Sequence, residues 1–268
     1  MKSKYGFTEF ENISEFKTWL ASQKVTRTIN KLQVHHTYAP AYSNWATDDA
    51  LRRQNNMKNY HVKTNGWADI AQHFTVFPNG HIVTGRSLNS SPVGITGWNT
   101  GAICVEIYGN FDIDKMNQEQ ADAIIALYGE LCKKFNITPS ESTIRYHAWF
   151  TAKGVYLGNY IAGKSTKTCP GKKFFGGNTI SAYKANFLPK IQAYIKGDTG
   201  FQNYLVRITA TELNGRKGPG VHNSIVMVIP KGTVITIVAE QYVGSTKWLK
   251  AKSGYWISAA YTEFVRNA

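Results

Sequence analysis

The chain has 268 residues, of which 43% are hydrophobic and only 18% charged, a balance typical of a folded globular protein rather than a disordered one. Lysine and arginine total 31 against 17 aspartate and glutamate residues, and a net charge of +14 favours a polyanionic partner such as nucleic acid, anionic lipid or a bacterial wall. The basic residues occur in runs no longer than a pair, which excludes a basic tail, and three widely spaced cysteines argue against a disulfide framework or a zinc finger.

The N-terminal segment does not resemble a signal peptide. It carries two lysines, but Glu9, Glu11 and Glu15 interrupt any apolar stretch. No apolar run along the chain reaches the ~20 residues that a membrane-spanning helix needs. We therefore expect synthesis in a cytoplasm and no transmembrane segment.

Helical and extended patterns alternate through the first 195 residues. Asn12 followed by Glu15 is typical of a helix start, and apolar residues at i, i+3, i+4 spacing predict the clearest helix at 117–135. Asn79-Gly80 between two β-prone runs predicts a hairpin over 73–84. The other expected elements are a strand at 31–35, a helix at 47–63 with Leu51 and Tyr60 facing inward, a central strand at 102–108, a short β-like run at 144–147 and a helix near 180–195. This order predicts an α/β fold, with a mixed central β-sheet flanked by helices.

The composition changes near residue 198, beyond which no helical periodicity occurs. Short β-rich runs follow instead, at 204–210, 226–229, 233–238, 248–251 and 255–257. Turn signals separate them, among them Asn214-Gly215 and Ser253-Gly254. This pattern predicts a small all-β barrel. We therefore predict two domains, residues 1–197 and 198–268.

Three residues of the larger domain have side chains that suit a metal ion. His35 ends a strand-like run, His147 follows another, and Cys169 lies in a loop with proline and glycine. Neutral imidazole and thiolate are good zinc ligands, and three protein ligands with one open position form the usual catalytic arrangement. Scattered positions support this weakly, so two structural histidines and a buried cysteine remain the alternative.

Glu106 is a lone carboxylate in the otherwise apolar run Ala102–Tyr108. Burial without a partner is costly, so the side chain must face a cation, a cavity or solvent. In a cavity its pKa would rise, which suits a general base. The pattern alone does not separate this role from simple solvent exposure.

Several short motifs follow one another in a recognisable order. They are Val34-His35-His36-Thr37, Gly66-Trp67-Ala68-Asp69-Ile70, His73-Phe74, Gly85-Arg86, Glu106 before Gly109-Asn110, His147, and Lys167-Thr168-Cys169-Pro170-Gly171. This order resembles the type-2 N-acetylmuramoyl-L-alanine amidases, a family of phage endolysins, bacterial recycling amidases and animal peptidoglycan recognition proteins. The resemblance covers about residues 1–190 and is nearest to the phage endolysins.

The resemblance implies one zinc ion, bound by His35, His147 and Cys169. It matches Glu106 to the family's catalytic glutamate, and Lys167 to a lysine that stabilises the oxyanion. The implied reaction is hydrolysis of the amide between N-acetylmuramic acid and the L-alanine of the stem peptide.

The sequence departs from the family at Gln72, where several members carry a catalytic tyrosine. Glutamine cannot act as a general acid or base, so we expect that role to pass to Glu106. We expect Gln72, Trp67 and His36 to contact substrate. His36 is not expected to be a ligand, because adjacent side chains on a strand face opposite sides.

The last 70 residues resemble bacterial SH3-like cell-wall-binding domains. The run Leu213–Gly220 stands where those domains carry an LNVRSGPG-like run, and Gly254–Ile257 resembles their terminal strand. The expected partners are bacterial peptidoglycan and the anionic cell wall, with no nucleic acid, and we expect a monomer. Since no signal peptide is expected, a phage endolysin that is released from the host cytoplasm before it acts on the wall fits best, and a host autolysin is next.

Three other functions are weighed against this one. A non-catalytic peptidoglycan receptor on the same fold typically lacks a ligand, so Cys169 together with Lys167 argues against it. A nucleic-acid-binding protein would need a clustered basic stripe or a known motif, and neither is found. A glycosidase would need a carboxylate pair and would leave the two histidines and the cysteine unexplained.

Overall fold

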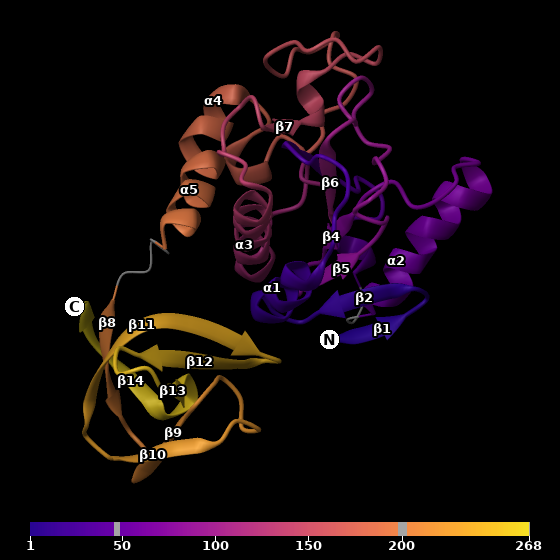
Figure 1. Ribbon diagram of the computed structural model, residues 1–268. Coiled ribbons are helices and arrows are strands. Elements are labelled where there is room, and N and C mark those ends of the chain that lie inside the picture. The colour runs from indigo at the N-terminus through magenta and orange to yellow at the C-terminus, as the bar shows by residue number, and fades with distance from the viewer. Residues whose placement is uncertain (46–48, 198–202, 268) are drawn as a thin grey trace. The chain divides into compact units, whose positions relative to one another are not determined.

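The computed structural model describes residues 1–45, 49–197 and 203–267. The chain forms two compact units, Met1–Gly197 and Asp198–Ala268 (Figure 1). Residues 46–48, 198–202 and 268 lie outside the described residues. The predicted helix start at Thr47 therefore lies outside them, and the predicted domain boundary at 197/198 lies at their edge.

A seven-stranded mixed sheet forms the centre of the first unit. Strands β3, β6 and β7 run parallel, as do β4 and β6, whereas β1, β2, β5 and β4 pair antiparallel. In spatial order the strands are β1 (Lys2–Lys4), β2 (Phe7–Phe10), β5 (Ile82–Thr84), β4 (Phe74–Val76), β6 (Ala102–Ile107), β3 (Lys31–His36) and β7 (Ile144–Tyr146). The predicted strand 31–35, hairpin 73–84 and central strand 102–108 are confirmed. The N-terminal hairpin β1–β2 was not predicted.

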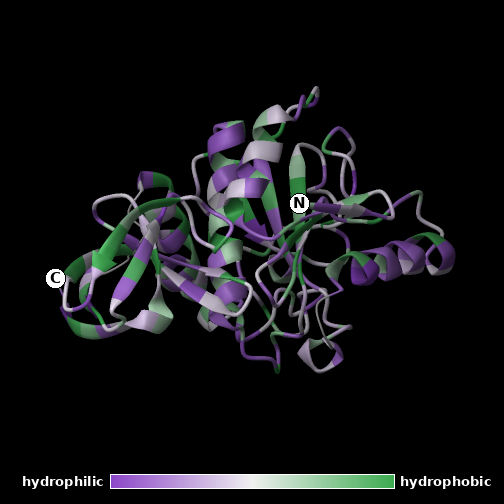
Figure 2. Ribbon diagram, turned by 90° about the horizontal axis from the view of Figure 1, so that it is seen from below, coloured by the Kyte–Doolittle hydropathy of each residue, from purple (hydrophilic) through white to green (hydrophobic). Residues whose placement is uncertain are grey.

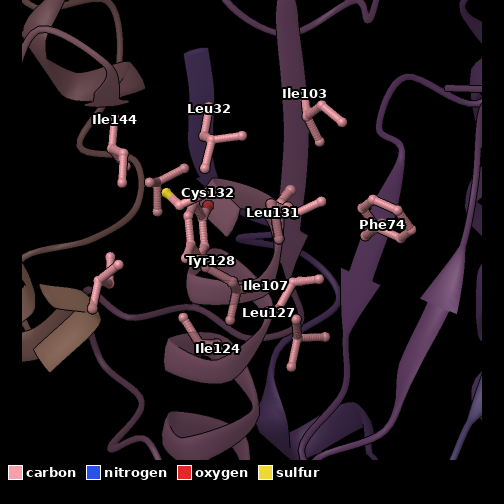
Figure 3. Packing of buried hydrophobic residues seen from close by; sticks show 14 of the residues in the cluster. Leu32, Phe74, Ile103, Ile107, Ile124, Leu127, Tyr128, Leu131, Cys132 and Ile144 are labelled. Atoms are coloured by element: carbon pink, nitrogen blue, oxygen red, sulfur yellow. The ribbon is translucent and has the colours of Figure 1, made fainter. Parts of the chain in front are cut away.

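One surface of the sheet, here called the α3 face, bears Leu32, Val34 and His36 of β3. Three helices belong to this layer: α1 (Ile13–Ser22), α3 (Gln118–Phe135) and α5 (Leu188–Lys196). Figure 3 shows side chains from α3 meeting strand residues such as Leu32 and Ile103 in a core of fully buried aliphatic and aromatic groups. Burial of this apolar surface is the main force holding the layers together.

The helix caps agree with the sequence patterns. Asn12 and Asn117 each accept a hydrogen bond from the backbone N–H three residues later, at Glu15 and Gln120. The predicted last helix is present in three parts: α4 (Ile180–Ala182), a π-helical segment (Tyr183–Phe187) and α5.

The opposite surface, here called the site face, bears Gln33 and His35 of β3. Helix α2 (Ala50–Asn59) covers its β5 and β2 end and packs Leu51 into a small apolar cluster. Figure 2 shows that α2 is hydrophilic along most of its length. The prediction that Tyr60 faces inward is wrong: Tyr60 opens a π-helical turn after α2 and is 58% exposed. Tyr60 follows Leu51 by nine residues, about two and a half helical turns, so the two side chains lie on opposite sides of the helix.

The second unit is a seven-stranded antiparallel sheet around a small apolar core. In spatial order its strands are β10 (Ile225–Pro230), β9 (Glu212–Arg216), β13 (Trp256–Ser258), β12 (Thr246–Ala251), β11 (Val234–Val243), β8 (Tyr204–Ile208) and β14 (Thr262–Asn267). The five predicted β-rich runs all lie on strands.

Asn214-Gly215 does not form the predicted turn, because both residues lie inside β9. A Cβ at Gly215 would come within 2.8 Å of Met227 on β10 and 3.0 Å of Tyr255 just before β13, so this glycine makes room for both side chains. Strand β9 was therefore missed, and β14 was not predicted either. No helix in the described residues is long and apolar enough to cross a membrane.

Candidate metal centre

His35 stands at the carboxyl end of β3, on the site face. Its Nε2 lies 3.2 Å from Gln33 Oε1, which also accepts the Ile95 N–H. Because an amide oxygen only accepts, Nε2 carries the proton, and the lone pair of His35 is on Nδ1. A neighbour that fixes the tautomer in this way is typical of metal-binding histidines.

His147 follows β7 and turns its ring toward His35. The two Nδ1 atoms lie 3.2 Å apart. Two nitrogens bound to one tetrahedral zinc ion at 2.0–2.1 Å are separated by about 3.3 Å. The histidine pair therefore has the spacing that a shared zinc ion requires.

Cys169 completes the cluster from a separate loop. The ligand atoms of His35, His147 and Cys169 all lie within 4.8 Å of one another. The backbone N–H of His36 donates to Cys169 Sγ at 3.3 Å, which favours the thiolate, whereas burial raises the pKa of the thiol. Imidazole and thiolate both bind zinc, and catalytic zinc sites use three protein ligands, so the residues present fit this metal.

Asp112 fixes the loop that carries the cysteine. Its Oδ2 accepts from the Thr168 hydroxyl at 2.5 Å, and its Oδ1 accepts from the Lys172 N–H at 2.9 Å. On the other side, the Asn178 amide donates to the Thr168 carbonyl oxygen. Hydrogen bonds thus fix Thr168 before Cys169 and Lys172 after it.

The histidines around the site are held neutral. Burial lowers the pKa of His147 to about 4 and that of His36 to about 4, and it lowers the pKa of His35 as well. The positive charge of Lys167 acts in the same direction on all three. Neutral imidazole is the form that binds a metal ion.

Glu106 is the neighbour of His35 across the parallel β3–β6 ladder and of Thr75 across β6–β4. Desolvation raises the pKa of its carboxyl group to about 8, and the positive charge of Lys167 opposes this rise. Lys167 itself is exposed. A carboxyl group with a pKa near neutrality can both accept and release a proton.

The three residues that we expected to contact substrate lie in three different surroundings. Gln72 is fully buried; its amide nitrogen donates to the Thr75 hydroxyl, and its Oε1 has no hydrogen-bond partner in the described part of the chain. His36 is on the α3 face, where its Nδ1 accepts the Phe111 N–H. Trp67 is half-buried and packs on His61, with ring centroids 4.8 Å apart. Contact of these three residues with substrate stays a prediction.

Sequence reasoning missed three residues that shape the site: Gln33, Asp112 and Gly94. A Cβ at Gly94 would lie 1.9 Å from Gln33 Oε1 and 3.0 Å from His35 Nε2, so the backbone approaches the site closely there. Gln33 was detectable, because residues i and i+2 of a strand share a face. Asp112 and Gly94 carry no such signal.

The sequence model of the N-acetylmuramoyl-L-alanine amidase family (Amidase_2) matches residues 25–172, which include all three candidate ligands. The chain belongs to this family. The match covers the strands that form the site and ends just after the Cys169 loop.

Relatives of the chain include peptidoglycan-recognition protein SC2 of Drosophila melanogaster, 27% identical over 104 residues, which are 39% of this chain and 55% of that protein. The human N-acetylmuramoyl-L-alanine amidase is 34% identical over 80 residues, 30% of this chain and 14% of that one. The chain thus spans about half the length of SC2 and less of the human protein. Among solved structures, the amidase LysC from Clostridium intestinale matches with a TM-score of 0.44 and 22% identity, covering 65% of this chain and 91% of that chain.

Proposed function

We propose that this protein is a zinc-dependent peptidoglycan hydrolase, which cleaves the amide bond between N-acetylmuramic acid and L-alanine of the stem peptide. The observation that carries the proposal is the convergence of His35, His147 and Cys169, whose ligand atoms lie within 4.8 Å of one another beside Glu106. Membership of the amidase family supports the same reaction.

The proposed mechanism gives each polar group of the site one role. His35, His147 and Cys169 would hold the zinc ion, which would supply a Lewis acid for the scissile carbonyl and for the ionisation of water at neutral pH. Glu106 accepts a proton from the attacking water and delivers it to the nitrogen of the leaving L-alanine. The Lys167 ammonium group stabilises the negative charge that builds on the carbonyl oxygen.

We further propose that the second unit is an SH3-like domain that binds the cell wall. Its small antiparallel sheet and its net charge of +4, from eight basic and four acidic residues in 198–268, support this role. A second attachment would raise the effective concentration of the catalytic unit near its substrate. In this proposal the protein is a phage endolysin that reaches the wall from the host cytoplasm.

The deciding experiment is mass spectrometry of the fragments that the protein releases from purified peptidoglycan. Stem peptides with a free N-terminal L-alanine, together with glycan strands free of peptide, are the expected products. New reducing sugar ends would instead identify a glycosidase. Binding without any release would identify a receptor on the same fold.

Removal of the metal ion provides an independent check. Treatment with a chelator should abolish release, and added zinc should restore it, because the chain's own residues lack a Lewis acid at this position. Release that persists at full rate in the chelator would reject the zinc mechanism.

A further inference from the structure

A groove of about 320 Å³ lies on the first unit, away from the His35–His147 pair. It is lined by residues from the loop before α3, the first turns of α3, the segment after Cys169, and α5, which lies beside α3 (Figure 1). Three lysines from separate segments, Lys115, Lys173 and Lys190, converge on it. It is called the lysine groove below.

The lysine groove has an excess of positive charge. Elsewhere in the described residues, lysines such as Lys17, Lys58 and Lys184 form ion pairs with carboxylates. Lys115, Lys173 and Lys190 form none within the described part of the chain, and Lys173 donates instead to the Ile113 carbonyl oxygen.

One acidic residue, Asp122, also lines the groove. It accepts a hydrogen bond from the Gln118 amide, so part of its carboxylate is already engaged. The lining therefore carries three cationic side chains against one anionic side chain. This balance favours an anionic ligand.

The floor of the lysine groove is apolar. Met116, Ile125 and Phe175 are half-buried there and pack against the main core. Phe175 adopts the left-handed conformation, at φ 41° and ψ 46°, which is uncommon for a residue with a large side chain. A cationic rim above a largely aliphatic floor suits a ligand with alternating charged and saturated parts.

The groove is continuous with the segments that hold the candidate metal ligand. Lys115 follows the loop that contains Asp112, and Lys173 follows the segment that contains Cys169. Asp112 joins these two segments through Thr168 and Lys172. A polymer bound in the groove would therefore keep the candidate metal site close to the wall that carries the polymer.

We propose that the lysine groove binds a phosphodiester-linked polyol, the anionic type of polymer that accompanies peptidoglycan in a bacterial wall. Lysine ammonium groups are compact point charges that suit repeated phosphates, whereas base-specific recognition favours the planar fork of arginine. The floor has a single half-buried aromatic ring, Phe175, among aliphatic groups, so it suits a saturated polyol better than successive stacked bases, which require exposed aromatic faces. The choice of a wall polymer rests on the proposed function, but the groove's affinity for a phosphodiester-linked polyol does not.

The test measures binding of the full-length protein to purified poly(glycerol phosphate), free of peptidoglycan, by calorimetry at several salt concentrations. The groove variant is Lys115→Gln/Lys173→Gln/Lys190→Gln. Its matched control, Lys24→Gln/Lys63→Gln/Lys196→Gln, removes the same charge from exposed positions outside the groove. Thermal unfolding checks that both variants are folded, and the single charge reversal Lys190→Glu serves if the triple variant is not.

We expect the groove variant to bind the polymer about tenfold or more weakly at low salt, and its slope of log K against log salt to become shallower by about 2–3. The control should change affinity far less. Equal weakening in both variants would overturn the proposal in favour of diffuse attraction by net charge.

A single-stranded oligonucleotide with the same number of phosphates is the competing probe. Tighter groove-dependent binding of the oligonucleotide than of the polymer would also overturn the proposal. Because no peptide is present, failure of the amidase assay leaves this result unaffected, and the reverse also holds.

Discussion

The two faces of the central sheet differ along adjacent rows of the same strands. On the α3 face, the row across β5, β4, β6 and β3 contains Ile82, Val76, Ile107 and His36. On the site face, the next row contains Val83, Thr75, Glu106 and His35. Both rows are largely buried, so burial alone does not separate them.

The difference between the faces is what covers them. The α3 face is covered by helices through apolar contacts, and its polar group His36 is satisfied by one backbone N–H. The site face is covered around His35 by loop backbone, since Gly94 lies against Gln33 and His35. Apolar packing thus fixes the strands, and hydrogen bonds from loops then orient the reactive groups.

Loss of the candidate cysteine ligand should have the largest effect, and it should distinguish the site face from the apolar core on the α3 face. Cys169→Ala removes the thiolate, so we expect zinc content and amidase activity to fall to background. Cys132→Ala, which deletes a buried thiol of α3 in the apolar core, should keep both. Metal analysis and fragment release measure these outcomes, and an active, zinc-loaded Cys169→Ala protein would remove the cysteine from the ligand set.

Replacement of the carboxylate beside His35 should affect chemistry without affecting the metal ion. We expect Glu106→Gln to lower kcat by about 10²–10⁴, because a glutamine amide cannot accept the proton of water. Zinc content should stay at the parent level. Glu119→Gln, an exposed position in the first turn of α3, is the control. A Glu106→Gln protein with most of its activity would show that another group is the base.

A single added carbon in the covering loop should disturb the site face alone. The Cβ of Gly94→Ala would overlap Gln33 Oε1, so either the loop or Gln33 must move. We expect a loss of about 1–3 kcal/mol in unfolding free energy and weaker zinc binding, measured by denaturant titration and metal competition. Ser91→Ala, at an exposed position of the same loop, should show neither effect.

Acid should weaken the metal-free protein through histidines on both faces. In the unfolded chain histidine takes up a proton near pH 6.5, whereas His36 and His147 do so only near pH 4 in the folded protein. Their neutral state therefore stabilises the fold above pH 6.5, and this stabilisation is lost as the pH falls toward 4, by up to about 1.4 kcal/mol per pH unit for each group. Urea titrations of chelator-treated protein at pH 7 and 5 measure it, and His36→Asn should show a smaller pH dependence than the parent.

Most strands of the first unit follow from patterns that lie close together in sequence. Alternation along β3 places His35 and His36 on opposite faces, as expected. The sequence left open whether Glu106 faces a cavity or solvent, and its raised pKa reflects a desolvated environment. The ligand set itself came from family resemblance, because no local spacing connects residues 35, 147 and 169.

The remaining features depend on contacts between distant segments. Asp112 acts on Thr168 and Lys172, more than 50 residues away, and nothing in its neighbourhood indicates this. Gly215 resembles a turn residue, but the space that requires a glycine there is set by distant side chains, Met227 of β10 and Tyr255 just before β13. Tyr60 was misplaced because its spacing from Leu51, about two and a half helical turns, puts the two side chains on opposite sides of α2.

The hydrogen bonds of Asp112 have a consequence for how the centre assembles. They order the Cys169 loop while the chain folds, so the entropy cost of fixing that loop is met before any ion arrives. A pre-organised set of ligands binds its metal more tightly than the same ligands on a loose loop. At the proposed metal site, the Asp112 carboxylate, which is not among the candidate ligands, would thereby lower the free metal concentration at which the site stays occupied.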